Sequence, residues 1–123
     1  MEKGLQITHD EIIQAKNNQK FVEMAARQVV KDFATCGMAI EFPSDIIFAY
    51  DQLFDQVLDI ISELLNENEE KLRALLYRID LSEKNMKQAT LAASDQTRGI
   101  IIAELILERE MQKVLIRNYF SNL

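Results

Sequence analysis

The stretch from Ser94 to Phe120 constrains the fold most, because it is the most apolar of the long stretches in the chain. It contains no Pro, and its second half is rich in Leu, Glu, Arg, Met, Gln and Lys, which favour helix. The β-branched run at residues 100–102 would also suit a strand, but no turn signal separates this run from the residues that follow. The stretch therefore predicts one long helix.

The apolar side chains of this predicted helix surround its axis instead of forming one stripe. At about 100° per residue, those of residues 100–103, 105–107, 111 and 114–116 point in nearly every direction. A helix of this kind is usually buried on several sides, so we expect it to lie at the centre of the fold. Glu104 and Glu108 interrupt the apolar runs, which are therefore too short to cross a bilayer.

Capping signals and apolar periodicity predict four further helices. The first follows a capping-box pattern at Thr8 and Glu11 and ends before Gly37, while the second follows Ser44. The predicted helices cover residues 9–36, 45–65, 70–79, 83–93 and 94–120. We therefore expect an all-α protein, an antiparallel bundle of three long and two short helices with the C-terminal helix central.

The chain predicts a single helical domain over residues 1–123, with residues 1–8 as a flexible N-terminal segment. Its 123 residues suit one domain, and no repeat or linker divides them. The first residues lack the apolar core of a signal peptide, and the single Cys36 cannot form an internal disulfide. These features predict a cytoplasmic protein. A net charge of −6 argues against nucleic-acid and membrane partners, since both favour basic surfaces.

The charge pattern is the most specific signal in the sequence. Between Glu41 and Glu70 there are nine acidic residues and no Lys or Arg. Four of the nine recur at every fourth position on one helix face: Asp51, Asp55, Asp59 and Glu63, here called the acidic ladder. Two basic stripes complement it: Lys16, Lys20, Arg27 and Lys31 on the first helix, and Arg109, Lys113 and Arg117 on the last. Like charges spaced i,i+4 destabilise a helix by a few tenths of a kcal/mol per pair unless a cation neutralises them.

Two interpretations of this pattern stay open. The charged faces could be solvated, with some pairing between helices that contributes under about 1 kcal/mol for each exposed pair. Alternatively, they form a partner surface, on which the acidic ladder meets a basic stripe of a second copy or a separate basic protein. A divalent-cation site on the ladder is less favoured, because carboxylates along one helix face do not converge on one point.

Glu104 and Glu108 are the candidate buried carboxylates. Glu104 falls between the directions of Ile100, Leu107 and Met111, which should face the core, and Glu108 lies one turn further on. Two coupled buried acids could perform general acid–base chemistry. The alternative is a structural ion pair with Arg73, Arg78 or Arg98.

No other recognised constellation carries chemistry. With one histidine, His9, and one cysteine, the chain cannot assemble a His/Cys zinc set. It contains neither of the glycine motifs that cradle phosphates. We therefore assign no catalytic, cofactor-binding or metal-binding residue and expect no cofactor.

The sequence favours a non-enzymatic role as a helical protein–protein interaction or structural module that associates with itself or with a protein partner. The alternative is a helical protein that binds a small molecule or a cation in a carboxylate-lined pocket at Glu104 and Glu108. Such a protein could also be a hydrolase. A polar pocket at those two residues would favour the alternative, and a flat apolar patch would favour the first function.

Overall fold

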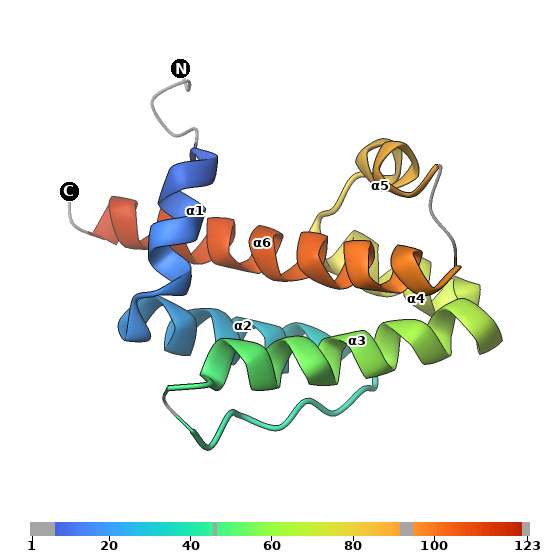
Figure 1. The fold of residues 1–123 in the computed structure, drawn as a ribbon, viewed down its shortest axis with the longest axis horizontal. Coiled ribbons are helices and arrows are strands. Elements are labelled where there is room, and N and C mark those ends of the chain that lie inside the picture. The colour runs from blue at the N-terminus through green and yellow to red at the C-terminus, as the bar shows by residue number, and fades with distance from the viewer. Residues whose placement is uncertain (1–6, 46, 92–94, 122–123) are drawn as a thin grey trace.

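The computed structural model describes residues 7–45, 47–91 and 95–121, which are helical throughout apart from short connections and one long one (Figure 1). The helices are α1 (His9–Lys16), α2 (Gln19–Thr35), α3 (Ala49–Glu67), α4 (Glu69–Ile79), α5 (Glu83–Thr90) and α6 (Asp95–Ser121). No strand occurs among the described residues. The predicted all-α helical bundle is confirmed.

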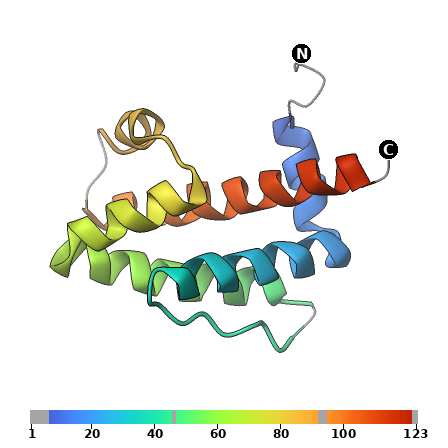
Figure 2. The same cartoon turned by 180° about the vertical axis from the view of Figure 1, so that it is seen from behind.

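The C-terminal helix α6 is central, as predicted, because it contacts each of the other five described helices. Figures 1 and 2 show α2 and α3 along one side of it, α1 crossing near its C-terminal end, and α4 and α5 near its N-terminal half. Both α2 and α3 run antiparallel to α6. They are parallel to each other, because the long connector of residues 36–48 carries the chain back to the end where α2 began (Figure 1).

The predicted first helix is two helices, separated at Asn17 and Asn18. Asn17 ends α1, and the side chain of Asn18 caps α2 by accepting a hydrogen bond from the Phe21 backbone N–H at 3.3 Å. The break lies within a polar run that offers nothing to bury. It lets α1 turn away from α2 and cross α6. Gly37 follows the end of α2 with φ of 80°, the left-handed geometry predicted for it.

The second predicted helix starts later than expected, so the predicted cap at Ser44 is wrong. Helix α3 begins at Ala49, and the residues before it belong to the connector. Gln56 of α3 holds the connector through two 2.8 Å hydrogen bonds with the Glu41 backbone, one to its N–H and one to its C=O. Asp45 accepts a hydrogen bond from the Ile47 backbone N–H at 2.9 Å, which forms a turn in place of the first helical turn.

The core has two adjoining parts. The larger joins α2, α3, α4 and α6 around fully buried side chains such as Phe33, Val57 and Ile106. The smaller joins α1, the first half of α2 and the C-terminal half of α6. Ile7, at the end of the predicted N-terminal segment, packs against this smaller part, and Thr8 caps α1. Residues 1–6 and the predicted cap Ser94 lie outside the described residues.

Candidate functional site

The acidic ladder occupies the outer face of α3. Its four carboxylates are exposed, on the side of the helix opposite the buried Leu53, Val57 and Ile61. Among the described residues, none of the four takes part in an ion pair or a hydrogen bond through its side chain. Asp51 lies in the first turn of α3, where a negative charge is favourable. The other three gain no such compensation.

The basic stripe of α6 faces α2 and the end of α4, and not the acidic ladder. Arg109 contacts Asp80 at 3.1 Å, and Lys113 contacts Asp32 at 2.9 Å. Arg117 donates a hydrogen bond to Gln28 Oε1 at 2.8 Å. Of the possibilities that the sequence left open, pairing of this stripe with the acidic ladder inside the chain is not observed among the described residues. The three basic side chains already have partners within the protein.

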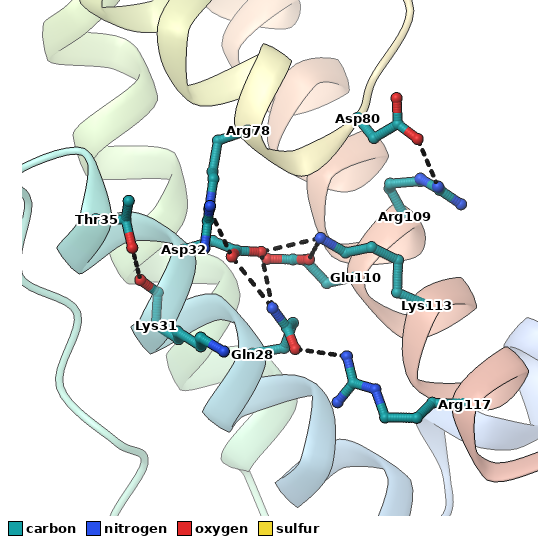
Figure 3. A network of polar contacts seen from close by, with 10 residues as sticks. All are labelled: Gln28, Lys31, Asp32, Thr35, Arg78, Asp80, Arg109, Glu110, Lys113 and Arg117. Atoms are coloured by element: carbon teal, nitrogen blue, oxygen red, sulfur yellow. Dashed lines mark hydrogen bonds and ion pairs between the residues drawn. The ribbon is translucent and has the colours of Figure 1, made fainter. Parts of the chain in front are cut away.

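Lys113 contacts a buried acid pair that the sequence did not predict. The pair is formed by Asp32 and Glu110 (Figure 3). Asp32 is 2% exposed and Glu110 is 0% exposed. Lys113 Nζ lies between them, 2.9 Å from Asp32 Oδ2 and 2.7 Å from Glu110 Oε1. Arg78 Nε, from the last turn of α4, lies 3.3 Å from Asp32 Oδ1. The pair therefore links α2, α4 and α6.

The two carboxyls of the pair differ in their affinity for a proton. Burial raises the pKa of Glu110 to about 8, and the hydrogen bond with Asp32 acts in the same direction, against the attraction of Lys113. Burial would also raise the pKa of Asp32, but hydrogen bonds from Glu110, Lys113 and Gln28 outweigh it and lower that pKa. The two shifts have opposite directions, so a proton shared by the pair is held more strongly by Glu110 than by Asp32.

The predicted buried carboxylates are not the ones that the structure buries. Glu104 is exposed, and Glu108 is half-buried beside Lys16, with 3.7 Å between Glu108 Oε2 and Lys16 Nζ. The reason is the rotation of α6 about its axis: Ile106, Glu110 and Val114 share the buried face, whereas Glu104 points about 120° away from it. The position of Glu110, one turn after Ile106 and one turn before Val114, is the signal that would have identified it.

Glu104 and Glu108 do have a shared neighbour in Tyr50 of α3. Burial raises the pKa of Tyr50, and the charges of Glu108, Glu104 and Asp51 act in the same direction. Lys16 Nζ lies 5.4 Å from the centre of the Tyr50 ring. Lys16, Tyr50 and Glu108 therefore meet at the junction of α1, α3 and α6.

Two of the pockets in the structure are lined by described residues. One, of about 310 Å³, lies between the α1–α2 corner, the connector and the start of α3. The other, of about 430 Å³, lies among α3, α4, α5 and α6. Neither is lined by Asp32, Glu104, Glu108 or Glu110. Neither of these two pockets is therefore the carboxylate-lined pocket expected at Glu104 and Glu108.

Large apolar side chains are exposed beside the first pocket, near the N-terminal end of the acidic ladder. Ile47 is 83% exposed, Phe48 is 55% exposed and Phe42 is 46% exposed. The guanidinium of Arg27 lies 5.3 Å from the centre of the Phe42 ring, so this part of the connector is held against α2. Phe48 is the residue directly before α3 and precedes Asp51 by three residues. The exposed apolar side chains of Phe42, Ile47 and Phe48, which we call the apolar patch, therefore come just before the acidic ladder in the chain.

No group of three His, Cys, Asp or Glu side chains within the described residues is arranged to hold a metal ion. None of the described helices has an apolar run of the length needed to cross a bilayer.

The chain matches no protein family model, no curated protein and no solved structure.

Proposed function

We propose that this protein is a non-enzymatic interaction module whose acidic ladder binds a basic segment of another protein. The observation that carries the proposal is the set of four exposed carboxylates on α3 that have no cationic partner among the described residues. Their mutual repulsion destabilises α3 by a few tenths of a kcal/mol per i,i+4 pair. A bound cationic segment would remove this repulsion.

The arrangement of the basic residues favours a partner other than a second copy. Arg109, Lys113 and Arg117 would have to leave their internal partners before they could meet the ladder of another subunit. A second copy could instead offer exposed cations such as Lys20 and Lys31 of α2. A homo-oligomer is therefore the second form of the same proposal.

The apolar patch supports a protein partner over a small polycation. Exposed apolar side chains grouped beside polar ones are typical of protein interaction sites. Ile47 and Phe48 stand where a bound segment would enter or leave the ladder, so they could contact an apolar side chain of that segment. A small polyamine has no large apolar side chain that could make this contact.

The test is the binding of a fluorescent helical peptide that carries Lys at every fourth position and one Phe near an end. Anisotropy should show binding at 50 mM NaCl that weakens at 300 mM, because screening acts on exposed pairs. Replacing the four ladder acids by Asn or Gln should weaken binding at least about tenfold, if each exposed pair contributes about 0.4 kcal/mol.

The matched control removes the same four charges elsewhere, with Asp10, Glu70, Glu83 and Glu104 replaced by amides. All four are exposed, so the net charge changes equally while the ladder stays intact. Equal weakening by both variants, or no binding at 50 mM NaCl, would reject the proposal. Light scattering at both salt concentrations separates a homo-oligomer from a monomer that binds the peptide.

A further inference from the structure

The buried acid pair places two carboxyl groups side by side in the interior (Figure 3). If both were ionised, two negative charges would adjoin where almost no water reaches them, and such an arrangement strongly favours protonation of one member. Lys113 contacts both carboxyls, but Arg78 reaches only Asp32. The cations are therefore distributed unevenly, in favour of the Asp32 anion.

The hydrogen bonds point in the same direction. Asp32 accepts hydrogen bonds from Gln28, Arg78 and Lys113. By contrast, neither oxygen of Glu110 accepts a well-aligned hydrogen bond from any described residue, although Lys113 is close enough for an ion pair. A proton on Glu110 turns the carboxyl from an unsatisfied acceptor into a donor, and Asp32 is the acceptor beside it.

We propose that Glu110 carries a proton in the folded protein at neutral pH, donates a hydrogen bond to Asp32 through its O–H group, and so makes the junction of α2, α4 and α6 a proton-operated lock. The lock is closed when the O–H group of Glu110 bonds Asp32. Loss of the proton leaves two adjacent anions that share Lys113, and it removes a hydrogen bond between α2 and α6 that does not depend on that lysine.

The charged groups around the pair come from each helix packed on it. They are Asp32 from α2, Arg78 from α4 and Lys113 from α6, while Arg117 is linked indirectly through Gln28. Arg109 and Asp80 form their own pair at the end of α4. Since arginine stays charged at every pH of interest, the Glu110 carboxyl is the group that responds.

The sign of the pH effect follows from the two states of Glu110. Its pKa is about 8 in the folded protein, and the ordinary value of 4.5 applies when the chain is unfolded. Between these values folding binds one proton, so the ratio of folded to unfolded protein falls by up to about tenfold per pH unit as the pH rises. The stabilisation is complete below pH 4.5 and is lost by about pH 8.

The experiment measures chemical unfolding from pH 5 to pH 9 for the natural chain, for Glu110→Gln and for Glu108→Gln. The amide of Gln keeps a donor for Asp32 but does not titrate. Relative to Glu110→Gln, the natural chain should lose at least about tenfold in its folded-to-unfolded ratio between pH 5 and pH 8. Glu108→Gln removes a carboxylate two residues away. Its folded-to-unfolded ratio, divided by that of the natural chain, should stay constant between pH 5 and pH 8.

Parallel pH curves for the natural chain and Glu110→Gln would overturn the proposal. A second measurement, on the natural chain, covers the case in which Glu110→Gln does not fold. In a sample with ¹³C-labelled Glu side chains, one carboxyl signal should titrate near pH 8. If each glutamate signal of the folded protein titrates below about pH 6, Glu110 is ionised at neutral pH and the lock does not exist.

Discussion

The acidic ladder and the buried acid pair are built from the same chemical group and behave in opposite ways. In the buried pair, carboxylate oxygens lie 2.7–3.3 Å from cationic nitrogens of α4 and α6. In the ladder, four carboxylates stand in water without a described partner. Desolvation is the cause of this difference, because a buried carboxylate must be paired or protonated, whereas an exposed one needs neither. The buried pair is therefore tied to partners within the fold, whereas the ladder is exposed and has no described partner.

The largest effect should come from Lys113→Met, which removes the cation that contacts both buried carboxyls. Asp32 and Glu110 would stay buried with a hydrophobic chain in place of the ammonium group, so we expect a loss of about 3 kcal/mol in the free energy of unfolding. Urea unfolding at pH 7 measures it. Lys31→Met is the control, because Lys31 is exposed on the same α2 that carries Asp32, and its effect should stay within about 0.5 kcal/mol. Equal effects would mean that the buried pair does not depend on its cation.

A smaller loss should follow from Asp32→Asn, with a characteristic dependence on pH. Hydrogen bonds lower the pKa of Asp32 below its ordinary value of 3.8, so its anion stabilises the fold above that pH. The variant should lose about 2 kcal/mol at pH 6, because charged hydrogen bonds are replaced by neutral ones. As the pH falls through the pKa of Asp32 in the folded protein, the natural chain loses the same contribution. The difference in free energy of unfolding between the natural chain and Asp32→Asn should therefore be smaller at pH 3 than at pH 6. A difference that stays constant would contradict the assignment of Asp32 as the anion.

The two regions also differ in how far the sequence could predict them. The pattern of α3 has one apolar stripe, so the opposite face could be assigned to solvent, and the four ladder acids do lie there. Helix α6 is apolar on nearly every side, and its periodicity leaves the direction of the core undetermined. The prediction therefore placed the buried carboxylate at Glu104 when it is Glu110. The start of α3 was predicted wrongly for another reason. Gln56 and Gln52 accept hydrogen bonds from the backbone of connector residues that lie 15 and 7 residues earlier in the chain, and local capping rules consider only adjacent residues.

The smallest effect should have the opposite sign and should come from the ladder. Replacing Asp55, Asp59 and Glu63 by amides removes the three i,i+4 repulsions and keeps Asp51, whose charge favours the start of α3. We expect the free energy of unfolding to rise by up to about 1 kcal/mol at low salt. In 1 M NaCl, where the screening length is about 3 Å, most of this gain should vanish. A gain that survives 1 M NaCl would show that repulsion is not its cause, and a loss would show that the ladder has stabilising partners, as the buried pair does.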